Sequence, residues 1–247
     1  MRPDEKLTMS DSRSETLRER ILQQQIAYYS ARANEYDEWF YRLGRYDRGD
    51  ELNQRWFAEI DIVKQALQQI GHTEEILELA CGTGIWTQEL LKIAKKIIAI
   101  DASAEVIEIN RSKLNSPKIK YQQVDLFAWE PDTEYDLVFF SFWLSHVPPE
   151  LLESFMSKVY KSVRVGGQVF IVDSRFEPTS TANNHLLNDD GSIYKIRKLN
   201  DGQEFQIVKI FYQPDELQNK LTQVGFIADV KVTEHYFIYA NATKFEN

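Results

Sequence analysis

The sequence predicts an α/β fold, with an open, mostly parallel sheet and helices on both of its faces. The apolar run at residues 76–79 leads into a loop that contains Gly82 and Gly84, and a helical pattern starts directly after it. Glycine lets the backbone bend sharply and lets a ligand approach the main chain closely. A second apolar run ends at Asp101, 17 residues after Gly84, and further apolar runs follow at residues 121–127 and 135–141. A glycine loop after the first parallel strand is where open α/β sheets bind nucleotides.

The details of this loop indicate which kind of nucleotide it suits. A dinucleotide fingerprint would place a third glycine at position 87, where the chain has Thr87, and the Gly-Lys-Ser/Thr of a Walker loop is absent. The pattern therefore suits a nucleoside ligand without a pyrophosphate. Asp101, at the tip of the second strand, is placed to accept hydrogen bonds from both hydroxyls of a ribose.

The stretch Glu-Leu-Ala-Cys-Gly-Thr-Gly at residues 78–84 resembles the first motif of the class I S-adenosylmethionine (SAM)-dependent methyltransferases, usually written D/E-x-G-x-G-x-G. Asp101, Asp125 and the run Asp-Leu-Val-Phe-Phe at 136–140 fall in the order and at about the spacing of that family. Ala80 stands where the motif usually has glycine, and we expect the turn to survive with slightly less room.

The resemblance is strongest over residues 70–172 and implies a Rossmann-like sheet of seven strands, mostly parallel. We expect a single domain, 1–247, with an N-terminal helical lid and an inserted β-hairpin near the C-terminal part. Its expected parts are a helical arm (1–71), a SAM-binding core (72–172), a loop and hairpin insertion (173–212), and a closing helix and strand pair (213–247).

The resemblance also implies SAM as the cofactor, with S-adenosylhomocysteine (SAH) as its product. Glu78 is expected to hold the amino-acid end of SAM, Asp101 the ribose and Asp125 the adenine amino group. The alternative for each acid is an N-cap of the following helix, which is most serious for Asp125. The expected SAM contacts are Tyr28, Arg32, Glu78, Ala80, Gly82, Gly84, Asp101, Ala102, Val106, Asp125, Leu126, Phe127, Ser141 and Phe142.

The tyrosine-rich segment 28–36 resembles helices that cover the cofactor in small-molecule members of the family. His146 is interpreted as a general base or substrate partner, or else as a structural hydrogen bond that fixes its loop. The catalytic candidates are His146, Tyr28 and Tyr36, and the expected substrate contacts are Tyr29, Trp39, Trp143, Arg197 and Tyr212. The alternative for the tyrosine-rich segment is an amphipathic helix that packs on the sheet. The alternative for the basic hairpin residues is that they form the solvent face of an edge strand. The histidines show no metal-ligand spacing, so no metal site is expected.

Composition limits the partners. The chain has 247 residues, a net charge of -9 and a pI of about 5.1, which argues against a nucleic-acid substrate. The single cysteine, Cys81, rules out an internal disulfide and fits the cytoplasm. No apolar run is long enough for a membrane span, and the polar start does not suit a signal peptide. We expect a small-molecule substrate and a monomer or homodimer.

These observations predict transfer of a methyl group from SAM to a small-molecule acceptor, without fixing an O, N or C atom. The first alternative is another SAM-consuming reaction on the same fold, such as cyclisation of SAM itself or aminocarboxypropyl transfer. The second is a macromolecule methyltransferase or a non-catalytic SAM-binding protein.

Overall fold

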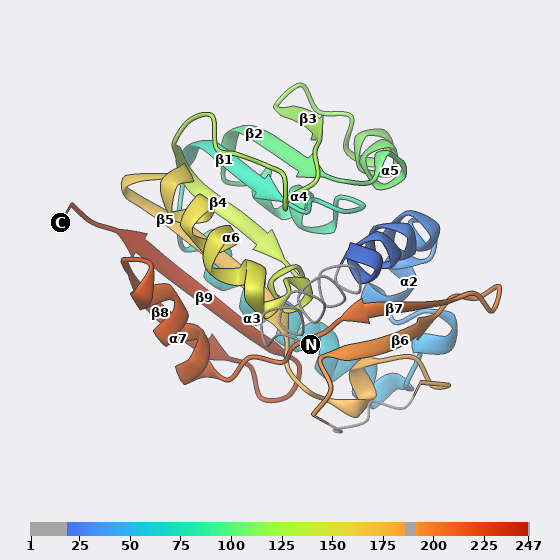
Figure 1. The fold of residues 1–247 in the computed structure, drawn as a ribbon. Helices are drawn as coiled ribbons and strands as arrows, with labels where there is room; N and C mark the ends of the chain where they lie inside the picture. The colour runs from blue at the N-terminus through green and yellow to red at the C-terminus, as the bar shows by residue number, and fades with distance from the viewer. Residues whose placement is uncertain (1–18, 186–190, 247) are drawn as a thin grey trace, which may run out of the picture.

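The structure, a computed structural model, describes residues 19–185 and 191–246. Its centre is a seven-stranded sheet in the order β3-β2-β1-β4-β5-β9-β8 (Figure 1). The first five strands are parallel, whereas β9 runs antiparallel to both β5 and β8. The predicted fold class is therefore confirmed. The strands of this sheet are β1 (Thr73–Leu79), β2 (Ala94–Asp101), β3 (Ile119–Gln123), β4 (Tyr135–Ser141), β5 (Val163–Ser174), β8 (Phe226–Val232) and β9 (Phe237–Lys244).

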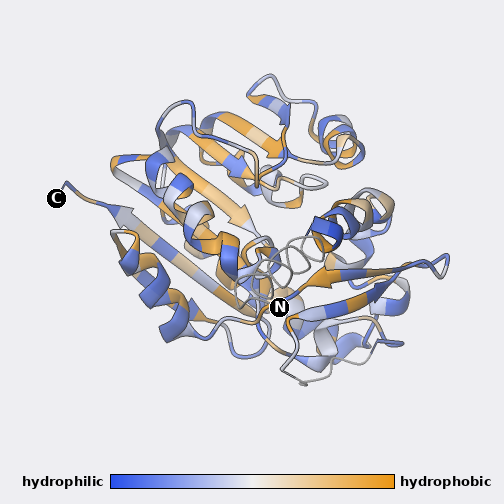
Figure 2. Ribbon diagram, viewed as in Figure 1, coloured by the Kyte–Doolittle hydropathy of each residue, from blue (hydrophilic) through white to orange (hydrophobic). Residues whose placement is uncertain are grey.

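Helices cover both faces of the sheet and create a separate apolar core on each. Side chains of α3, α4 and α5 pack on one face, and side chains of α6 and α7 pack on the other. Both faces of the central strands are thus buried, which explains their continuous apolar runs, drawn in orange in Figure 2. The helices are α2 (Tyr36–Phe40), α3 (Asp50–Gln68), α4 (Ile85–Leu90), α5 (Ala104–Leu114), α6 (Pro149–Ser162) and α7 (Pro214–Gln223), with short 3-10 turns η1 (Gly44–Tyr46), η2 (Leu144–His146) and η3 (Pro178–Ser180).

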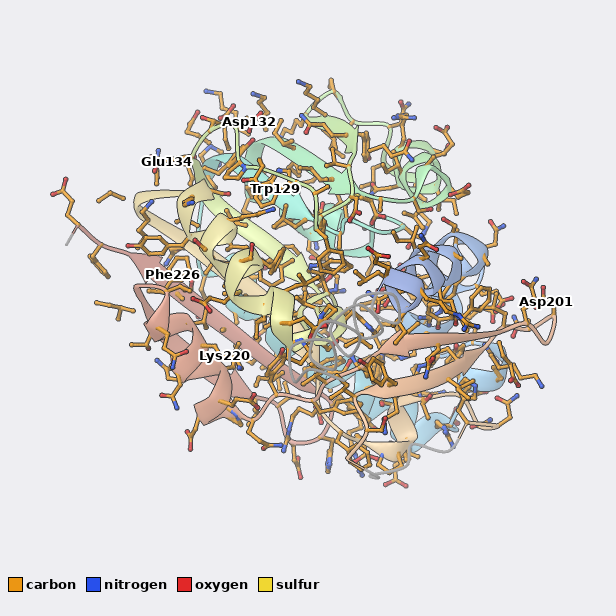
Figure 3. All side chains as sticks on the ribbon, in the orientation of Figure 1. Trp129, Asp132, Glu134, Asp201, Lys220 and Phe226 are labelled. Atoms are coloured by element: carbon orange, nitrogen blue, oxygen red, sulfur yellow. The ribbon has the colours of Figure 1, made fainter. Side chains whose placement is uncertain are left out.

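Two additions to this sheet lie over the C-terminal ends of its parallel strands. One is a helix at residues 19–32, and the other is a hairpin of β6 (Tyr194–Lys198) and β7 (Glu204–Val208), which forms its own two-stranded sheet. The helix lies along the hairpin, as Figure 1 shows, and Asp201 marks the hairpin's far tip in Figure 3.

These two elements match the lid and the inserted hairpin that the sequence predicts. The first 18 residues of the expected helical arm lie outside the described residues. Among the helices that the structure describes, none has the length and apolar character to cross a membrane.

Candidate active site

The turn after β1 combines two kinds of backbone constraint. Gly82 and Gly84 have φ values of +52° and +92°, and a Cβ on Gly84 would lie 2.7 Å from Oδ1 of Asn110 in α5. Gly84 therefore allows close packing of the turn against a helix. Ala80 (φ +54°) and Phe142 (φ +52°), which follow β1 and β4, also adopt the left-handed conformation. That conformation costs a non-glycine residue roughly 1–2 kcal/mol, and such strain is typical of functional sites.

Each carboxylate oxygen of Asp101, the last residue of β2, accepts a hydrogen bond from a backbone N–H group. Oδ2 accepts from the N–H of Gly82 at 3.0 Å, and Oδ1 accepts from the N–H of Ser103 at 3.0 Å. Burial raises the pKa of Asp101, and the backbone N–H groups of Ser103, Gly82 and Ala102 act in the opposite direction. Each oxygen keeps a lone pair free, so the side chain can accept two more hydrogen bonds. That is what a ribose diol requires.

The first cavity lies where the strand order reverses between β1 and β4, the usual ligand position in an open α/β sheet. It encloses about 760 Å³, including its open mouth. Asp125 lies at its rim, where Oδ1 accepts from the N–H of Phe127 at 3.0 Å. Because no helix follows, Asp125 caps a turn and keeps its other oxygen available. The lining residues are Gln25, Ile26, Tyr29, Tyr36, Ala80, Gly82, Asp101, Ala102, Ser103, Val106, Asp125, Leu126, Phe127, Ser141, Phe142 and Trp143.

A second cavity of about 660 Å³, again including its mouth, adjoins the first. Tyr29, Tyr36 and Phe142 line both cavities and so form their common wall. The sheet, the helix at 19–32 and the hairpin all contribute to the second cavity. Its lining residues are Tyr28, Tyr29, Arg32, Tyr36, Trp39, Tyr46, Phe142, His146, Ser174, Ser180, Thr181, His185, Arg197, Ile207, Lys209 and Phe211.

His146 connects the sheet to the hairpin. Its Nδ1 lies 2.6 Å from the carbonyl oxygen of Val208, and a carbonyl only accepts, so Nδ1 carries the proton and Nε2 carries a lone pair. The pKa of His146 is well below its usual value because the ring is buried and Lys209 is close. The side chain of Gln25 reinforces this junction, since it donates to the carbonyl of His146 at 3.0 Å and accepts from the N–H of Val208 at 3.1 Å.

Lys209, directly after β7, is anchored to the end of β5. Its Nζ donates to Oγ of Ser145 at 2.7 Å and lies 3.3 Å from Oδ1 of Asp173. Oδ2 of the same carboxylate accepts from the N–H of Ser145 at 2.9 Å. All three side chains are buried. The second cavity is therefore held in place by a closed polar network.

The structure brings most of the expected SAM contacts together in the first cavity but places several residues elsewhere. Arg32 and Tyr28 line the second cavity, whereas Trp143 lines the first, beside Phe127 at 5.3 Å between ring centroids. The positions of Arg32 and Tyr28 follow from the path of the lid, which sequence spacing does not fix.

Three expected site residues line neither cavity. The carboxyl group of Glu78 is buried beneath the turn, and Gly84 faces α5. Tyr212 is buried in the core beneath α7. Several lining residues were not anticipated, and most of them carry a polar or aromatic side chain. They are Gln25, Tyr46, Ser174, Ser180, Thr181, His185, Ile207 and Phe211.

The side chains that line the first cavity fit SAM. Asp101 offers two free lone pairs at the place of a ribose, and apolar side chains of Val106, Leu126 and Phe127 lie at the place of a base. When bound, SAM supplies an activated methyl group on a sulfonium. Among the described residues, no cluster of three or more His, Cys, Asp or Glu side chains is arranged to hold a metal ion.

Comparison with known proteins agrees with this geometry. The family model described as "Methyltransferase domain" matches residues 76–167. An uncharacterised methyltransferase of Schizosaccharomyces pombe is 30% identical over 109 residues, and a malonyl-[acyl-carrier protein] O-methyltransferase of Ilyobacter polytropus is 30% identical over 97 residues. These matches cover 40% and 38% of this chain, and only 38% and 35% of the two relatives.

Solved structures extend the similarity to nearly the whole chain. The DhpI–SAH complex is 32% identical with a TM-score of 0.72, and the match covers 93% of this chain and 99% of that one. The DhpI–SAM–HEP complex matches with the same identity and TM-score over 90% of this chain and 97% of that one. The chain therefore belongs to the class I SAM-dependent methyltransferases and is an enzyme that uses SAM.

Proposed function

We propose that this enzyme transfers the methyl group of SAM to a small molecule bound in the second cavity. The observation that carries this proposal is the common wall of the two cavities, formed by Tyr29, Tyr36 and Phe142. A methyl donor in the first cavity and an acceptor in the second would meet at this wall. Holding two reactants in register supplies a large share of the rate of such transfers.

The size and cover of the second cavity support a small acceptor. The helix at 19–32 and the β6–β7 hairpin both line it. Gln25 joins this helix to the hairpin at Val208 and to the loop after β4 at His146. A nucleic acid or folded protein would need an open, extended surface instead. One relative is named a probable ribosomal RNA small subunit methyltransferase A, of Thermococcus sibiricus, but the match covers only 36% of this chain.

The proposed roles follow the cavities. Asp101 binds the ribose of SAM, Asp125 the adenine amino group, and the aromatic residues around them hold the base. Tyr29, Trp39 and Arg197 contact the acceptor. His146 acts through its Nε2, whose lone pair can accept a hydrogen bond. We also propose a single domain and, from the composition, a cytoplasmic enzyme that works as a monomer or homodimer.

The test is to supply SAM carrying a labelled methyl group together with three separated cell fractions, which are small metabolites, total RNA and total protein. We expect label to enter the small-metabolite fraction in an enzyme-dependent way. Label in RNA or protein alone would refute the proposal, and loss of SAM without any added fraction would indicate a reaction of SAM itself.

A further inference from the structure

The charge of the second cavity is opposite to that of the protein. The chain carries 38 acidic and 29 basic residues, yet three cations and no described carboxylate line this cavity. One cation, Lys209, has its counter-ion in Asp173. The other two, Arg32 and Arg197, have no carboxylate partner within residues 19–185 and 191–246. Among the residues that the structure describes, no carboxylate in this cavity therefore balances these two positive charges.

The two guanidinium groups come from two different elements that line the cavity. Arg32 belongs to the helix at 19–32 and lies over the rings of Tyr36 and Tyr28, at 5.0 and 5.5 Å from the centroids. Its Nε is buried without a hydrogen-bond partner among the described atoms. Arg197 belongs to β6. A buried charge without a counter-ion is costly, and a ligand that supplies one recovers that cost.

Positive charges in the cavity also affect the pKa values of His185 and Arg197. The pKa of His185 is lowered to about 4 by burial, together with the charges of Arg197, Arg45 and Arg32. Burial and the charge of Arg32 also lower the pKa of Arg197 itself. Burial is the main cause of both lowered pKa values, and the nearby guanidinium charges add to it.

We propose that the second cavity binds a small oxyanion between Arg32 and Arg197, and that an ionised oxygen of this ligand accepts the methyl group. Planar guanidinium groups bind carboxylates and phosphate-type groups through paired hydrogen bonds, and Arg suits them better than Lys. This inference rests on the proposed function and specifies its substrate class.

The side chains at the junction of the cavities favour an acceptor that is already ionised. Burial raises the pKa of Tyr36 and, further, that of Tyr29, so neither is a base near neutral pH. His146 has the lowered pKa of a weak base. An ionised oxygen needs no base. Its lone pair forms the new bond to the methyl carbon, the carbon–sulfur bond breaks, and that electron pair stays on sulfur. The negative charge of the acceptor and the positive charge of the sulfonium disappear together, and no proton is released.

Binding is tested first, with the full-length protein saturated with SAH. Inorganic phosphate and acetate are the probes, with uncharged glycerol as the reference, and affinity is measured by calorimetry. We expect at least one anion to bind and Arg197→Gln to weaken it at least tenfold, with Arg197→Lys between the two. The control is Lys198→Gln on the same strand, where the side chain is exposed and pairs with Glu204 at 3.8 Å. SAH affinity must stay within twofold in all these variants, which shows that the fold persists.

Three results would overturn the inference. They are binding of neither anion, equal binding of glycerol, and anion binding that Arg197→Gln leaves unchanged. If Arg32→Gln weakens SAH but not the anion, Arg32 belongs to the cofactor and its share of the oxyanion site is refuted.

The reaction is tested with a panel of short carboxylic, phosphoric and phosphonic acids and their uncharged amides or esters. We expect methyl esters from the acids only. In weakly buffered solution, at a pH above the second pKa of the phosphoric and phosphonic acids so that every acid is fully ionised, we expect no proton release. One proton released per methyl group transferred, or methylation of a neutral acceptor, would refute the oxyanion while leaving small-molecule methyl transfer intact. No methylation of any small molecule would instead remove the proposed function.

Discussion

Replacing Asp101 by alanine tests the SAM site most directly. Each carboxylate oxygen already accepts one backbone N–H, from Gly82 or Ser103, and has one lone pair left for a ribose hydroxyl. Hydrogen bonds contribute about 0.5–1.5 kcal/mol each, and more when the acceptor is charged. Loss of two therefore costs about 1–3 kcal/mol of binding free energy. This corresponds to SAH binding that is weaker by roughly 5- to 150-fold.

The substitution also removes the acceptor of two backbone N–H groups, so a fall in thermal stability is expected as well. Calorimetric titration with SAH well below the melting temperature separates the two effects. Asp132→Asn is the matched control, because this exposed acid lies before β4, at the opposite end of the sheet (Figure 3). A lower melting temperature with unchanged SAH affinity would refute the ribose role and leave Asp101 as a residue that shapes the turn.

Three further substitutions test the surroundings of the site. Ala80→Gly should relieve the strain of φ +54° and raise the free energy of unfolding by about 1 kcal/mol in urea titration, and no gain would show that the turn is unstrained. Burial raises the pKa of Glu78 from 4.5 to about 8, so its stabilising effect is complete below pH 4.5 and is lost as the pH rises through about 8. In the ligand-free protein, Glu78→Gln should therefore gain roughly 1 kcal/mol on the wild type per pH unit between pH 5 and 8, and a pH-independent difference would contradict the raised pKa. Gln25→Ala leaves the carbonyl of His146 and the N–H of Val208 without their side-chain partner, so amide exchange in β7 should speed up and KM for the acceptor should rise while SAH affinity changes little.

The core of the site was predictable because its signals are local. The turn at 78–84 and Asp101 are positioned by strands that the sequence marks clearly, and parallel strands bring their C-terminal ends to one edge. Trp143, an expected substrate contact, lines the first cavity, and this position has another origin. Residues after β4 pass between the two cavities, and only the packed structure decides which side each ring faces.

The burial of the basic hairpin residues could not be predicted from the sequence. The sequence left two interpretations open for the basic hairpin residues, a substrate contact at Arg197 or the solvent face of an edge strand. In the structure Arg197 lines a cavity and Lys209 is buried. The reason is long-range. The inner face of the hairpin packs against the helix at 19–32, where Tyr28 contacts Phe205 at 5.7 Å between ring centroids. Contacts between segments more than 170 residues apart leave no trace in local periodicity.

The common wall of the two cavities would couple the binding of SAM to that of the proposed acceptor. A ligand that orders Tyr29 or Tyr36 changes the boundary of its own cavity and that of the neighbouring one. Affinities at the two cavities are therefore linked, and linkage is reciprocal, so the factor by which the acceptor alters SAM binding is the factor by which SAM alters acceptor binding. A dissociation constant measured for one ligand describes this enzyme only together with the occupancy of the other cavity.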